Sequence, residues 1–119
     1  LPARYPDATR LDIDHMIPLK NAHDSGGWAW DRSRKAAFAN EMRVHHLIAV
    51  TASANRKKGA RGPEEWKPTT RGYWCDYAID WVQIKTDWDF SATKAEWGAL
   101  QEMLETCDST PSKRQFRNA

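Results

Sequence analysis

Residues 11–19 of the chain read LDIDHMIPL, and this stretch predicts the central element of the fold. Apolar and polar residues alternate up to His15, which is the period of a half-buried β-strand, and Pro18 ends the strand. Asp14 and His15 are therefore predicted to lie at a strand end. Because neighbouring strand residues point to opposite faces, one site uses both side chains only if the chain turns there, as Pro18 indicates.

Asp14 and His15 together offer two of the groups that hydrolysis of a phosphodiester needs. Hard divalent cations such as Mg²⁺ bind carboxylate and amide oxygens and keep several waters. An imidazole near neutral pH takes a proton from water, so a metal ligand and a general base stand side by side. Taken alone, the pair is also typical of a carboxylate that only orients a histidine in a structural hydrogen bond.

The second informative stretch, residues 45–51, reads HHLIAVT and predicts a short buried strand with a histidine pair at its entrance. Ser53 is predicted to N-cap the helix that follows, which places Asn55 in the first turn and Gly59 at the end. The basic residues 56–58 lie between them. Each residue taken singly also has a plain interpretation, Asn55 as a turn or capping residue and the basic run as a solvated face.

The order of these stretches resembles the HNH endonucleases with the ββα-metal fold, in particular the secreted bacterial branch related to the C-terminal nuclease domain of GmrSD-type restriction enzymes. The resemblance runs from about Leu11 to Cys107. It is carried by residues 14–19 (DHMIPL), 24–26 (DSG), 38–41 (FANE), 47–50 (LIAV), 53–56 (SANR), 58–59 (KG), 63–66 (PEEW) and 73–75 (YWC). It implies a metal-dependent nuclease in which Asp14 and Asn55 bind the metal and His15 is the general base.

One position departs from the family pattern, which most often has Asn just before the second strand, where this chain has His46. A histidine there fixes the base or binds the metal, and added imidazole favours Zn²⁺, Ni²⁺ or Mn²⁺ over Mg²⁺. His45 competes for this role, because only one of two adjacent strand residues reaches the site. We expect His46 as the site histidine and Mg²⁺ as the metal, with His45 and the other ions left open.

The mechanism implied is hydrolysis in which His15 deprotonates a water in line with the scissile phosphorus. The cation on Asp14 and Asn55 would neutralise the departing 3′ oxygen, and Lys58 or Arg56 would stabilise the added charge of the transition state. Contacts to the nucleic-acid backbone are predicted for Arg56, Lys57, Lys58 and Arg61.

Composition is compatible with this hypothesis without requiring it. The 119 residues are predicted to form one domain, a monomer with a flexible tail from about residue 108. The net charge of +2 does not identify a nucleic-acid binder, but residues 53–72 hold six basic residues against two acids. No hydrophobic stretch approaches membrane-spanning length, so no membrane partner is expected.

The cysteines and tryptophans indicate a helical hairpin. Residues 93–96 form a capping box that opens one helix, and residues 74–86 predict the helix before it. If the two helices pack antiparallel, Cys75 lies opposite Cys107, in disulfide geometry. Two buried free thiols are the alternative and would fit a cytosolic protein, but the pairing geometry and the first residue, Leu rather than Met, favour secretion. Helical spacing assigns three tryptophans to the core rather than to base stacking: Trp81, Trp88 and Trp97.

The sequence thus predicts a mixed α+β fold, a short two-stranded ribbon amid several helices with more helix than strand. The leading function is a secreted, nonspecific endonuclease that hydrolyses DNA, with RNA as a further substrate and an immunity or inhibitor protein as a partner left open. One alternative is a nucleic-acid-binding module that has lost catalysis, and the complete set of Asp14, His15 and Asn55 argues against it. Another is a structural Zn²⁺ module, and the lack of a four-ligand Cys/His pattern argues against that.

Overall fold

The computed structural model describes residues 11–41 and 46–107 of the chain. The elements in chain order are β1 (Leu11–His15), α1 (Leu19–Asp24), η2 (Gly27–Ala29), α2 (Arg32–Ala39), β2 (Leu47–Thr51), α3 (Ala52–Lys58), η3 (Arg71–Tyr73), α4 (Trp74–Asp87) and α5 (Lys94–Leu104). Within this part of the chain helix exceeds strand, which confirms the predicted helix-rich α+β fold. The predicted flexible tail and His45 lie outside the described residues.

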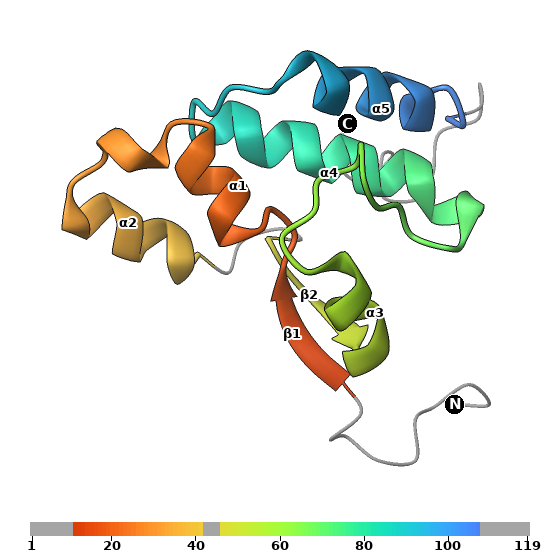
Figure 1. The fold of residues 1–119 in the computed structure, drawn as a ribbon, viewed down its shortest axis with the longest axis horizontal. Coiled ribbons are helices and arrows are strands. Elements are labelled where there is room, and N and C mark those ends of the chain that lie inside the picture. Colours follow the sequence, from red (N-terminus) through yellow and green to blue (C-terminus); the bar gives the residue numbers. More distant parts are fainter. Residues whose placement is uncertain (1–10, 42–45, 108–119) are drawn as a thin grey trace, which may run out of the picture.

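The two strands form an antiparallel ribbon with α3 packed beside it. The register pairs Leu11 with Thr51 and His15 with Leu47, and Met16 N donates to His46 O at 2.9 Å just beyond the last pair. Figure 1 shows the ribbon and α3 projecting from a layer in which α4 and α5 lie side by side. As predicted, β1 ends before Pro18, and α1 begins directly after this proline.

Helix α3 begins two residues earlier than the sequence predicts. Its N-cap is Thr51 rather than Ser53, and the Thr51 hydroxyl accepts from Ala54 N at 3.0 Å. Thr51 is the last strand residue and already has the extended backbone that an N-cap needs, so the strand passes directly into the helix. Asn55 is therefore the fourth helical residue. Gly59 ends the helix, as predicted, with a φ of 51° that favours glycine.

Helices α4 and α5 form the predicted hairpin, and the structure joins its open end through a disulfide between Cys75 and Cys107. The Cα atoms of the two residues are 5.0 Å apart. Thr93 caps α5 as predicted, because its hydroxyl accepts from Glu96 N at 3.1 Å. The loop between the two helices thus closes the hairpin at one end, and the disulfide closes it at the other.

Reducing this disulfide is expected to lower the free energy of unfolding by roughly 3–4 kcal/mol, because the open chain gains loop entropy when it unfolds. The measurement is the urea midpoint with and without reductant. A variant with both Cys75→Ser and Cys107→Ser is the control, since the chain has two cysteines and the variant should match the reduced parent in either buffer. An equal midpoint for the oxidised and reduced parent would contradict the expectation.

The hydrophobic core joins the ribbon to the helical hairpin. Met16 and Ile17, directly after β1, are fully buried against the core cluster that contains Tyr77 and Trp81 of α4. The other buried members are Ala22, Phe38, Ala78, Ile84, Leu100 and Met103. The end of β1 is consequently fixed by the core, which holds the backbone of the preceding Asp14 and His15 in place.

The prediction that Trp97 belongs to the core is wrong, because its side chain is 44% exposed, whereas Trp81 is buried and Trp88 packs against the core. Glu96 takes the inward position instead. Its Oε2 accepts from Trp81 Nε1 at 2.7 Å and forms an ion pair with Lys85 Nζ at 2.7 Å. A buried carboxylate with these partners is satisfied, so Glu96 rather than Trp97 lies on the buried face of α5 beside Leu100.

Candidate functional site

Asp14 and His15 contact different helices, because the alternation of the strand persists to its end. The turn that would bring both side chains to one face is therefore not present within β1, and the two residues share only the strand end. Asp14 Oδ2 accepts from Lys58 Nζ at 2.7 Å and so faces α3. The His15 ring bonds to the backbone oxygen of Ala39, the last residue of α2, over 2.8 Å. The two side chains leave the ribbon at the same end, with α3 contacting the one and α2 the other.

The bond to Ala39 sets the proton on the His15 ring. A carbonyl oxygen only accepts, so Nε2 must be the nitrogen that carries hydrogen and donates. In the neutral ring Nδ1 then holds the lone pair. The backbone of α2 therefore fixes both the orientation of the imidazole and its tautomer, which leaves Nδ1 as the basic atom.

Lys58 is buried, with 1% of its surface exposed, and this position corrects the prediction that it binds the nucleic-acid backbone from the surface. Its ammonium donates to Asp14 Oδ2 at 2.7 Å and to His15 O at 2.8 Å. Burial lowers the pKa of Lys58, and the hydrogen bond to the Asp14 carboxylate opposes that shift. The side chain ties α3 to the last two residues of β1 and holds the Asp14 carboxylate in place.

The other three predicted cations do lie at the surface. Arg56 and Lys57 are exposed on α3, and Arg61 is exposed just after it, with its guanidinium donating to Lys57 O. Exposure is what contact with phosphates requires, so the contact of these three residues with nucleic acid stays a prediction.

His46 is buried among aromatic rings. Its ring centroid lies 4.6 Å from that of Phe38 and 6.3 Å from that of His15. Trp88 lies 6.4 Å away on the same cluster. In the described residues no group of three or more His, Cys, Asp and Glu side chains could hold a metal, which disfavours a structural Zn²⁺ module made of Asp14, His15 and His46. Metal binding by His46 stays a prediction.

Asn55 and Lys58 share one face of α3 and line a pocket of about 490 Å³. The pocket lies between β2, α3, the segment 66–70 and two tyrosines, Tyr73 and Tyr77. Burial, and then the Asp14 carboxylate, raise the pKa of Tyr77, so its hydroxyl stays protonated. The sequence pattern predicts no role for the aromatic side chains of this pocket, although Trp66 and Tyr73 lie in two of the stretches that carry the resemblance.

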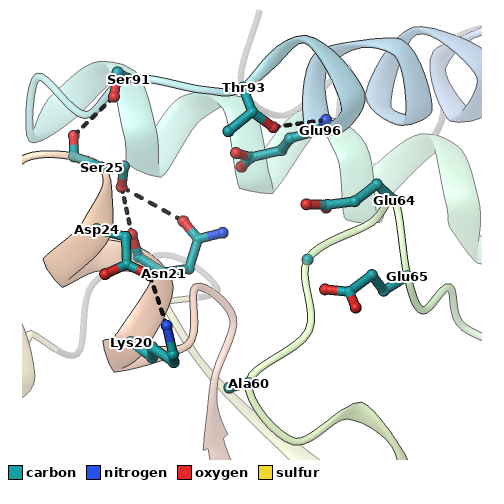
Figure 2. Close-up of a pocket in the computed structure, with 11 residues that line it drawn as sticks. Lys20, Asn21, Asp24, Ser25, Ala60, Glu64, Glu65, Ser91, Thr93 and Glu96 are labelled. Carbon is teal, nitrogen blue, oxygen red and sulfur yellow. Dashed lines mark hydrogen bonds and ion pairs between the residues drawn. The ribbon is translucent and has the colours of Figure 1, made fainter.

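A second pocket, of about 240 Å³, has a different character. Figure 2 shows the carboxylates of Asp24, Glu64, Glu65 and Glu96 around it, with Lys20 paired to Asp24 at 2.8 Å. Such a lining repels phosphate. This pocket is therefore disfavoured as a site for a polyanion.

The chain is similar to known proteins at the level of sequence. A family model described as the C-terminal domain of GmrSD restriction endonucleases matches residues 3–103. An uncharacterized secreted protein of Arthroderma benhamiae is 46% identical over 105 residues, which are 88% of this chain. The chain spans about half, 52%, of the length of that relative. No solved structure matches the chain.

Proposed function

Because the chain belongs to the family of GmrSD restriction endonuclease C-terminal domains, we propose that it is a metal-dependent endonuclease of the HNH type that hydrolyses phosphodiester bonds in DNA. One observation carries the proposal. The backbone of Ala39 holds Nε2 of His15 as a donor, which leaves Nδ1 as a base at the strand end where Asp14 also lies. A histidine fixed in one tautomer is prepared to take a proton from water.

The donor atoms of Asp14 and Asn55 suit a hard cation. Asp14 supplies a carboxylate and Asn55 an amide oxygen, from two elements that pack together, β1 and α3. Mg²⁺ accepts such a small protein ligand set because it keeps several waters, whereas Zn²⁺ prefers three or four nitrogen and sulfur ligands. Lys58 binds Oδ2 of Asp14, and we assign the other oxygen, Oδ1, to the cation. When bound, the cation supplies positive charge to the departing 3′ oxygen.

The other steps of the proposed mechanism are assigned to side chains of the protein. His15 Nδ1 removes a proton from the attacking water. Lys58 is a positioning residue, because its ammonium holds the Asp14 carboxylate and the His15 carbonyl at fixed places. The exposed side chains of Arg56, Lys57 and Arg61 hold the phosphates on either side of the cleaved bond.

We further propose that the protein acts outside the cell. The Arthroderma benhamiae relative is named a secreted protein. The disulfide between Cys75 and Cys107 supports the same location, since such bonds persist in oxidising compartments and are rare in the cytosol. None of the described helices is long and apolar enough to cross a membrane.

A second candidate function is a nucleic-acid-binding module without catalysis. It is favoured by one observation, the ion pair in which Lys58 already neutralises Asp14, the proposed metal ligand. Such a module would bind nucleic acid through the exposed cations of α3 and would be indifferent to chelators.

Cleavage of supercoiled plasmid separates the two candidates. We expect nicking with Mg²⁺ that stops in EDTA, and Mn²⁺, Ni²⁺ and Zn²⁺ assayed in parallel rank the cations. The same reactions with a labelled RNA show whether RNA is also a substrate. Intact plasmid with every cation, from a protein shown to be folded by circular dichroism and to bind DNA, would favour the binding module.

A further inference from the structure

The pocket beside Asn55 has the size of a site for a small ligand. Its volume of about 490 Å³ falls within the roughly 300–1,000 Å³ of small-ligand pockets. Trp66 and Tyr73 form part of its wall and are each only partly buried, so ring surface remains accessible. Both rings pack edge-on against the buried Tyr77, with centroids 6.2 Å and 5.6 Å from it. The aromatic wall is therefore held by the core.

Contacts of Trp74 also hold the segment that carries the aromatic wall. Trp74 Nε1 donates to Pro68 O at 2.7 Å, which attaches the segment 66–70 to the start of α4. The cations of Lys67 and Arg71 lie over the Trp74 ring, at 5.7 Å and 4.7 Å from its centroid. A pocket with a fixed wall is formed before the ligand arrives, so binding costs little ordering of the protein.

The charge of the pocket favours a ligand that carries phosphate. Among the described residues that line it none is acidic and Lys57 is an exposed cation, whereas the ammonium of Lys58 is already paired with Asp14. The pocket of Figure 2 is the opposite, with four carboxylates and one lysine. An aromatic wall with cations at its side is the arrangement that binds nucleotides, because bases stack on the rings while the cations neutralise the backbone.

We propose that this pocket holds one unpaired nucleobase of the strand whose phosphodiester lies at Asp14, His15 and Asn55. The inference rests on the proposed function, since it names the form of nucleic acid that the same site takes. A base inside a duplex is stacked and paired, and it enters a pocket lined by β2, α3 and the segment 66–70 only after it leaves the stack. The protein should therefore discriminate in favour of single strands.

The test measures binding by fluorescence anisotropy in EDTA, so it needs no catalysis. The probes are a labelled thymidine oligonucleotide and a labelled duplex, and a uridine oligonucleotide distinguishes DNA from RNA as the source of the base. Trp66→Leu keeps an apolar side chain and removes the ring. We expect it to weaken oligonucleotide binding about 5- to 140-fold, which corresponds to the roughly 1–3 kcal/mol of one stacked base, and to leave duplex binding unchanged.

Trp28→Leu is the matched control, because Trp28 is 65% exposed and lies outside this pocket. Ser53→Leu is a second variant for the case that Trp66→Leu does not fold. It places a larger side chain at an exposed position that lines the pocket and should also weaken only the binding of the oligonucleotide. The proposal would be overturned if Trp66→Leu and Trp28→Leu bound the oligonucleotide with equal affinity. It would also be overturned if Trp66→Leu weakened the binding of duplex and oligonucleotide equally. Failure to cleave both the plasmid and the thymidine oligonucleotide would overturn the nuclease function and leave the binding result standing.

Discussion

His15→Ala is expected to lower the rate of plasmid cleavage by about 10²–10⁴-fold, the range that a general base contributes, while DNA affinity stays near that of the parent. The reason lies in the atom that the mutation removes. Nδ1 of His15 takes a proton from water in the proposed mechanism and holds no phosphate. Cleavage rate and anisotropy binding, measured on the same preparation, report the two effects separately.

His23→Ala is the matched control, because His23 is exposed on α1 and makes no contribution to the proposed site. It undergoes the same substitution and purification, so a contaminating nuclease would give equal cleavage in both preparations. Circular dichroism checks that loss of the bond to Ala39 has not unfolded the protein. Cleavage by His15→Ala at the rate of His23→Ala would show that another group activates the water.

The parts of the fold that follow from local pattern were predictable. The alternation in residues 11–15 and the proline after them determine where β1 ends, and both features lie within a few residues of the strand. The same holds for Thr93, whose cap on α5 depends on residues three positions apart. The position of Asp14 and His15 at a strand end was therefore available from sequence.

The environment of each site residue could not be predicted from the sequence, because it depends on contacts with residues far away in the chain. Lys58 belongs to a basic run that predicts a solvated face, but its partner Asp14 is 44 positions earlier, and the pair buries the ammonium. The tautomer of His15 depends on Ala39, which is 24 positions away. The burial of Trp97 was mispredicted for a related reason, because two adjacent helix residues both fit a helical spacing pattern. The ion pair of Glu96 with Lys85 of α4 places Glu96 on the inward face instead.

The second large effect is expected for Lys58→Met, which should destabilise the protein by about 3–5 kcal/mol in EDTA. Methionine fills a similar volume, so the loss comes from the Asp14 carboxylate, whose side chain is 14% exposed and would lack its cation. Lys57→Met is the control, because Lys57 is the exposed neighbour on the same helix. Urea unfolding measures both, and a Lys58→Met midpoint equal to that of Lys57→Met would show that the buried pair contributes nothing.

A double variant and a titration with Mg²⁺ then connect this pair to the proposed site. Adding Asp14→Leu to Lys58→Met should recover much of the lost stability, because replacing both members of a buried ion pair by apolar residues is close to neutral. If the Asp14 carboxylate also binds the cation, Mg²⁺ should raise the melting temperature of Lys58→Met more than that of the parent, since the ion supplies the missing positive charge. An equal rise in both proteins would instead place the cation away from Asp14, because only the Asp14 carboxylate differs in its partner between them.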